Sequence, residues 1–172
     1  MPAQIQNQRR ILIAAPADVA FQFFTPAGEQ IWIDDWRPRY IHPSDGTTVA
    51  GMVFTTGEGP EHTIWQLLDF DPGRRMSRYA RTTPGLRTGT VTVQATALDT
   101  QSTEVLVHYD MTALSDAGAA SLEQYLDPAF AQALDAWGEK IRRRLPQLLQ
   151  AFGRSYASIR STSSSSTCGN ER

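Results

Sequence analysis

The stretch TGTVTVQATAL, residues 88–98, and the stretch STEVLVHYDMTAL, residues 102–114, decide the fold. Apolar and polar residues alternate singly along both, as in the run from Val91 to Ala95. Because successive side chains of a strand point to opposite faces, this pattern predicts two strands that each bury one face. The short turn between them, which begins at Asp99, predicts that the two strands pair antiparallel.

Toward the N-terminus, short segments rich in β-branched and aromatic residues are separated by turn signals that contain glycine, proline or aspartate. No helical periodicity interrupts them, so they predict further strands of one antiparallel meander. These segments are RPRYIHP at 37–43, GMVFTTG at 51–57, HTIWQLLDF at 62–70 and RMSRYART at 75–82.

The N-terminal part of the chain predicts one more strand and two short helices. The segment IQNQRRILIA, residues 5–14, alternates as a strand does. Pro16 ends that strand and suits the first turn of a helix, whose apolar stripe runs to Phe24. This helix should stop before Pro26, and residues 27–36 should form a second short helical piece.

The chain after Ser115 predicts a long amphipathic helix. Ser115 and Asp116 give a helix N-cap signal, and apolar residues then recur at spacings of three and four. At Pro128 the sequence allows either a fresh helix or a kink within one helix, and Pro146 should bend or fray the end. The predicted apolar stripe consists of Leu122, Leu126, Phe130, Ala133, Trp137, Ile141, Leu145 and Leu148.

The elements together predict one α+β domain. A twisted sheet of about seven antiparallel strands should curve, and its concave face needs an apolar cover. The long C-terminal helix can supply that cover, with two short helices placed after the first strand. The 172 residues fit a single core, predicted over residues 1–156, whereas the serine-rich residues 157–172 predict a disordered tail.

With these elements in hand, the chain resembles the START/Bet v 1-like superfamily, also called SRPBCC. This superfamily includes polyketide cyclases, lipid-transfer domains and activators of the Hsp90 ATPase. The resemblance rests on ILIAAPADVAFQFFTPAGEQIW at 11–32, on the alternating pair at 88–114, and on LDAWGEKI at 134–141. It implies a helix-grip fold over about residues 5–150, with an internal apolar cavity between sheet and helix that binds a hydrophobic molecule.

Charge and composition argue against several classes of protein. The formal net charge is -2 and the isoelectric point about 5.9, without the clustered basic face of a nucleic-acid-binding protein. The basic run at 142–144 suits the last turns of a helix. A single cysteine, Cys168, cannot form an internal disulfide framework. No apolar run approaches the ~20 residues of a membrane helix. The sequence predicts a cytoplasmic monomer or homodimer with no nucleic-acid partner and no membrane span.

Polar-tipped and aromatic residues are the candidates for orienting a ligand, because cavity walls are mostly apolar with a few placed polar groups. An arginine at such a wall could hold a ligand carboxylate through two hydrogen bonds. No catalytic residue is assigned and no cofactor is predicted. The three histidines fall on different predicted strands or strand ends, so no metal site is predicted. The candidate ligand-binding residues are Trp36, Arg39, Trp65, Tyr79, Arg81, His108, Tyr109 and Trp137.

Three functions fit this sequence. The preferred one is binding or transport of a hydrophobic small molecule, because no acid–base pair is evident among the candidate cavity residues. The first alternative is a polyketide cyclase/dehydratase-like or hydrolase-like enzyme acting on an aromatic or acyl substrate, which needs titratable groups with tuned pKa values inside the cavity. The second alternative is a protein-interaction module of the Hsp90-activator type, which needs an exposed apolar patch outside the cavity.

Overall fold

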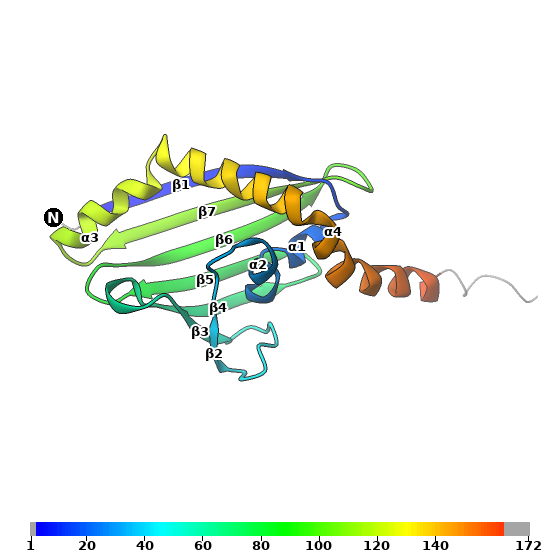
Figure 1. Cartoon of the computed structure of the whole chain (residues 1–172), viewed down its shortest axis with the longest axis horizontal. Helices are drawn as coiled ribbons and strands as arrows, with labels where there is room; N and C mark the ends of the chain where they lie inside the picture. Colours follow the sequence, from blue (N-terminus) through cyan, green and yellow to red (C-terminus); the bar gives the residue numbers. More distant parts are fainter. Residues whose placement is uncertain (1–2, 164–172) are drawn as a thin grey trace, which may run out of the picture.

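The computed structural model describes residues 3–163 and contains one antiparallel sheet of seven strands (Figure 1). The order of the strands across the sheet is β1-β7-β6-β5-β4-β3-β2, so the first strand pairs with the last and the rest follow as a meander. The strands are β1 (Gln4–Ile13), β2 (Arg39–His42), β3 (Val53–Thr56), β4 (Thr63–Asp71), β5 (Met76–Thr83), β6 (Arg87–Ala97) and β7 (Thr103–Ala113).

Helices cover one face of this sheet. Figure 1 shows α4 (Ala129–Ser163) running along β1 and then past α1 (Ala17–Gln22) and α2 (Pro26–Trp32), with which it also makes contact. Short helical segments η1 (Gly59–Glu61), α3 (Asp116–Ser121) and η2 (Leu122–Tyr125) complete the chain. The predicted α+β helix-grip architecture is therefore confirmed, with its two short helices after the first strand and its long C-terminal helix.

The long helix begins afresh after Pro128, which decides between the two alternatives that the sequence left open. It does not end at Pro146 but continues to Ser163. A proline removes one backbone donor, and here its neighbours in the helix keep their helical conformation. The predicted boundary at residue 157 thus falls inside α4. Residues 164–172 lie outside the described part of the chain, so the disordered tail stays a prediction.

The predicted apolar stripe is buried or half-buried except at Leu126 and Ala133. Leu126 is 46% exposed and Ala133 is also exposed, whereas Leu134 is buried. Leu126 is exposed because it has an extended backbone between η2 and α4 and does not belong to either helix. Ala133 lies after this break, and there the spacing of four from Phe130 and of seven to Ile141 places Leu134 on the buried face instead. The fully buried residues of α4 are Phe130, Leu134, Ile141 and Leu148.

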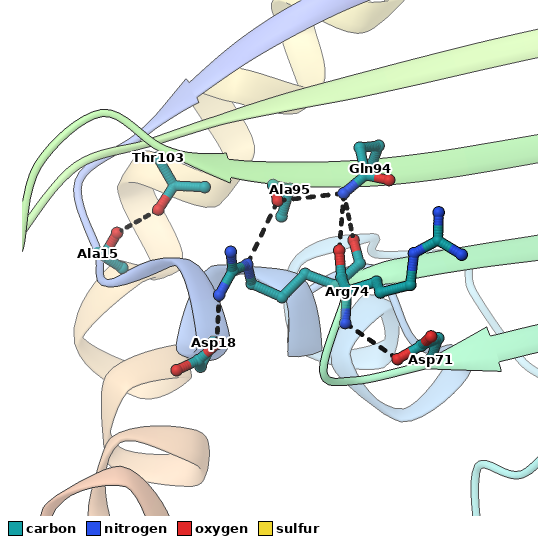
Figure 2. Close-up of polar contacts among 8 residues, drawn as sticks. Ala15, Asp18, Asp71, Arg74, Gln94, Ala95 and Thr103 are labelled. Carbon is teal, nitrogen blue, oxygen red and sulfur yellow. Dashed lines mark hydrogen bonds and ion pairs between the residues drawn. The ribbon is translucent and has the colours of Figure 1, made fainter.

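Strand alternation sets the face of each side chain. On β7 the residues Val105, Val107 and Tyr109 are buried on the helix-covered face, and His108 between them faces the other way. Polar contacts hold the end of the sheet where β1 passes into α1. The Thr103 hydroxyl donates a hydrogen bond to the Ala15 carbonyl at 2.7 Å, as Figure 2 shows. These contacts fix the start of α1, and with it the position of α2.

Helix α2 packs directly on the backbone at the end of α1. The Gly28 N–H donates to the Thr25 hydroxyl at 3.1 Å, which caps the helix. A Cβ atom on Gly28 would lie 2.1 Å from the Gln22 carbonyl oxygen, closer than any real contact. Glycine at this position therefore lets α2 approach closely enough to present its next residue, Glu29, to the sheet.

Replacing Gly28 by alanine is expected to destabilise the protein by about 1–3 kcal/mol, because the added methyl must displace backbone rather than a flexible side chain. The measurement is urea unfolding followed by circular dichroism. The matched control is Gly153→Ala in α4, where a Cβ meets no atom within 4 Å. A Gly28→Ala protein as stable as the parent would show that α2 is not held against α1.

Candidate ligand-binding site

A recess lies between α2, α4 and the concave face of the sheet. Its apolar floor is formed by Val91 and Val93 of β6 and by Val107 of β7. The enclosed cavity is about 30 Å³, whereas the recess counted to its open mouth and including the gaps between atoms is about 380 Å³. The enclosed cavity has room for a water molecule, and the larger volume includes open solvent at the mouth. The aromatic walls are formed by Trp36, Phe54, Trp65, Tyr79, Tyr109 and Trp137.

The register of the strands builds one wall of this recess. The pairing of β3 with β4 sets Phe54 opposite Trp65, and their rings stack at 5.8 Å with an interplanar angle of 3°. Trp36, from the segment after α2, packs its edge on Trp65 at 5.7 Å and donates its Nε1–H to the Pro26 carbonyl at 3.0 Å. The Trp65 indole N–H donates to the Thr56 hydroxyl at 2.9 Å. Both indoles are thus oriented by hydrogen bonds.

The opposite wall comes from the helices. Trp137 of α4 is half-buried, and its ring lies 5.5 Å from that of Trp32 in an edge-to-face arrangement. Trp32 is 1% exposed and donates its indole N–H to the Phe23 carbonyl at 2.8 Å. Trp32 therefore packs between α2 and α4 in the core, and Trp137 lines the recess.

One carboxyl group lies among these rings. Glu29 lines the recess from α2. Burial raises the pKa of its carboxyl well above the ordinary value of 4.5, and the positive charge of Arg81 opposes that rise only in part. A carboxyl in an apolar recess keeps its proton to higher pH than a solvated one, since the charged form loses its hydration there. Glu29 can donate a hydrogen bond while protonated and accept a proton once ionised.

Two phenols face the same space. Tyr79 is 5% exposed and Tyr109 is 6% exposed. Burial is the largest cause that raises the pKa of both hydroxyls far above the ordinary 10, and the nearby Glu29 adds to the rise in each. Both stay protonated at physiological pH. The Tyr79 hydroxyl lies 3.5 Å from the Phe24 carbonyl, at the limit of a hydrogen bond, so it is available to a ligand.

Arg81 lies at the edge of the recess. The pairing of β5 with β4 sets it opposite Trp65, and its guanidinium carbon lies 4.6 Å from the centre of that ring. The same carbon is 5.8 Å from the ring of Tyr125 in η2. Within residues 3–163 its buried Nε has no hydrogen-bond partner. The guanidinium therefore packs on ring faces, and it lies close enough to the Tyr109 hydroxyl to oppose in part the rise in the pKa of that hydroxyl.

The structure brings together six of the eight residues predicted from the sequence. Trp36, Trp65, Tyr79, Tyr109 and Trp137 line the recess, and Arg81 contacts the ring of Trp65. The two others are placed elsewhere. His108 points to the opposite face of the sheet from its neighbour Tyr109, and Arg39 is exposed on β2 and does not line the recess. The predicted ligand role of these two has no geometric support.

Glu29 and Phe54 were missed by the sequence reasoning. Phe54 had a signal, because it alternates with polar residues in GMVFTTG and so belongs to a buried face. Glu29 had none, since a carboxylate in the run AGEQIW is most simply a solvated residue of a helix surface. Its inward position follows from the packing of α2 on α1.

Replacing Glu29 by glutamine is expected to make the stability less dependent on pH. The raised pKa means that folded Glu29 holds its proton more tightly than unfolded Glu29. The stabilisation is therefore fully present below the ordinary pKa of 4.5 and is lost as pH rises through the folded pKa. The stability of the parent relative to Glu29→Gln should fall steadily from pH 4.5 upward, measured by urea unfolding at a series of pH values. A constant difference would mean that the carboxyl is solvated.

Within the described part of the chain, no group of three or more His, Cys, Asp or Glu residues could hold a metal ion. Among the helices of residues 3–163, none has the length and apolar character needed to cross a membrane.

Comparison with known proteins supports the fold. No family model and no curated protein matches the chain. Among solved structures, the Zhui aromatase/cyclase from Streptomyces sp. R1128 is 18% identical, with a TM-score of 0.60 over 83% of this chain and 96% of that one. Norcoclaurine synthase from Thalictrum flavum is 13% identical, with a TM-score of 0.58 over 81% and 87%. A protein from Thermobifida fusca is 20% identical, with a TM-score of 0.60 over 80% and 93%. The predicted resemblance to the START/Bet v 1-like superfamily is confirmed at the level of the fold.

Proposed function

We propose that this protein binds a small, largely aromatic molecule in the recess between α2, α4 and the sheet. The observation that carries the proposal is the convergence of aromatic side chains from four strands, from α4 and from the link after α2 on one incompletely filled space. Protein interiors are normally packed without such space, so a gap lined by oriented rings favours an external molecule as its occupant. The enclosed space of about 30 Å³ is smaller than a ring compound, so a ligand enters only when the half-buried side chains of Trp36 and Trp137 move aside.

The chemistry of the walls supports an aromatic ligand. Rings that meet edge to face leave their own faces free for a further ring, and such pairs favour centroid distances of ~4.5–7 Å. Burial of the ligand in this apolar site contributes ~25 cal/mol per Å² of area removed from water, offset by the cost of ordering it. The hydroxyls of Tyr79 and Tyr109 and the carboxyl of Glu29 supply the few polar contacts that fix its orientation.

A second candidate function is catalysis of a proton transfer at Glu29. The observation that favours it is the raised pKa of this carboxyl inside the recess, because general acid–base catalysis needs groups tuned in this way. Two solved proteins of the same fold are an aromatase/cyclase and a synthase, so the fold is compatible with an enzyme. A survey of aromatic ketone and ester substrates separates the two functions. Turnover that Glu29→Gln abolishes while ligand affinity is kept would establish the enzyme.

Binding is tested with N-phenyl-1-naphthylamine, an uncharged dye whose fluorescence rises in apolar surroundings. We expect micromolar binding to the parent protein. Val91→Phe should remove it, because the larger ring occupies the floor of the recess between Tyr79 and Tyr109. The matched control is Thr92→Val on the same strand, whose side chain faces away from the recess.

Circular dichroism and melting temperature show whether each variant is folded. If Val91→Phe does not fold, Trp36→Ala serves instead, because Trp36 is only half-buried and lines the recess. Dye binding that is absent from the parent, or that survives both variants unchanged, would overturn the proposed function.

A further inference from the structure

The buried polar atoms without partners point to a charge that the described chain does not balance. Three buried side-chain nitrogens within residues 3–163 have no hydrogen-bond partner, namely Nε of Arg81 and Nε and Nη1 of Arg87. Such atoms are rare, because each costs the free energy of lost hydration. The two arginines differ in one respect. Arg87 forms an ion pair with Glu61, whereas Arg81 forms no ion pair with any described residue.

Arg81 is surrounded by the walls of the recess. Its guanidinium lies over the ring of Trp65, and its charge acts on the carboxyl of Glu29 and on the hydroxyl of Tyr109. All three of these residues line the recess. The Arg81 guanidinium, carried by β5, therefore lies beside the recess in which the proposed ligand binds.

The nearby carboxyl does not neutralise this cation by contact. No oxygen of Glu29 lies within 4.0 Å of Arg81, and burial favours the uncharged form of Glu29. An arginine is cationic at every physiological pH, so its charge persists in the apolar surroundings. Arg81 is half-buried, and its Nε is shielded from water without a partner, so an anionic group of the ligand would provide the missing acceptor.

We propose that the natural ligand is an aromatic carboxylate, whose ring lies among the walls of the recess and whose carboxylate accepts hydrogen bonds from the Arg81 guanidinium. This inference rests on the proposed function and names its ligand class. The planar fork of an arginine matches a carboxylate with two parallel hydrogen bonds, and these charge-assisted bonds are stronger than neutral ones. Arg81 is then the residue that selects anionic over neutral aromatic molecules.

The test compares two probes of nearly equal shape, 2-naphthoate and uncharged 2-naphthamide, by isothermal titration calorimetry at pH 7. We expect the parent protein to bind 2-naphthoate about tenfold or more tightly than 2-naphthamide. Arg81→Met keeps most of the length of the side chain and removes the charge, so it should bring the two affinities to within about twofold. Arg81→Lys keeps the charge without the fork and should retain only part of the preference.

The matched control is Arg78→Met on the same strand. Arg78 faces the other side of the sheet, where it forms an exposed ion pair with Asp69, so its loss should leave the preference unchanged. Equal affinities of the parent for the two probes, or a preference that survives Arg81→Met, would overturn the assignment of Arg81 while leaving the proposed function standing. If neither naphthalene compound nor the uncharged dye binds the parent, the proposed function and this inference both fail.

Discussion

Replacing Trp32 by alanine is expected to destabilise the protein by about 3–5 kcal/mol, the loss typical of a fully buried tryptophan. Trp32 is 1% exposed, its ring packs on Phe24 and Trp137, and its indole N–H holds the Phe23 carbonyl. Its removal leaves a cavity between α2 and α4 and an unpaired buried carbonyl. The measurement is the free energy of unfolding in urea, followed by circular dichroism.

Trp36→Ala is the matched comparison, because it removes the same side chain from the wall of the recess rather than from the core. Trp36 is only half-buried, so Trp36→Ala should lose clearly less stability than Trp32→Ala. Its affinity for the uncharged dye should fall further than that of a folded variant with a substitution in the core, because Trp36 lines the recess. Equal losses of stability for the two variants would mean that the recess is ordinary core.

Removing α4 is expected to abolish cooperative unfolding altogether. A chain that ends at Asp127 loses Phe130, which packs on Tyr109 at 5.6 Å, and Trp137, which packs on Trp32. It also loses the buried apolar residues Leu134 and Ile141 that help cover the helix-facing side of the domain. Exposed apolar surface of this extent favours aggregation or a loosely packed state. The measurements are urea unfolding and analytical size exclusion.

The control for this truncation is a chain that ends at Ser163, which keeps every described element. Its melting temperature should lie within a degree or two of the parent's, because every described contact is kept. A soluble chain ending at Asp127 with a sharp unfolding transition would contradict the prediction, because it would show that the sheet is stable without α4 as its cover.

Part of the site could be predicted because strands have a period of two. The alternation in residues 88–98 and 102–114 placed Val91 and Tyr109 on a buried face, and the structure confirms that both line the recess. The same alternation excludes His108, which stands next to Tyr109 and so points the other way. His108 was predicted as a ligand-binding residue from its residue type alone, although the alternation places it on the opposite face from Tyr109.

Helices allow less to be predicted, because their orientation depends on what they pack against. The break before Pro128 leaves Leu126 exposed outside both helices, and no feature of the sequence distinguished a break from a kink. Glu29 is the stronger case. Its place beside the rings depends on the close contact of Gly28 with the backbone of α1, which is a contact between two helices and leaves no periodic signal.

The sequence by itself determined the strands, their antiparallel meander and the long apolar helix, because hydrophobic periodicity is a local property of the chain. It also indicated which aromatic residues could line a cavity, but which of them point inward depends on strand register. The tertiary structure alone decided that Glu29 of α2 faces these rings, that Arg81 lies over the ring of Trp65, and that Arg81 has no ion-pair partner among residues 3–163. These facts depend on strand register and helix docking, which join residues far apart in the chain, and they give the recess its charge.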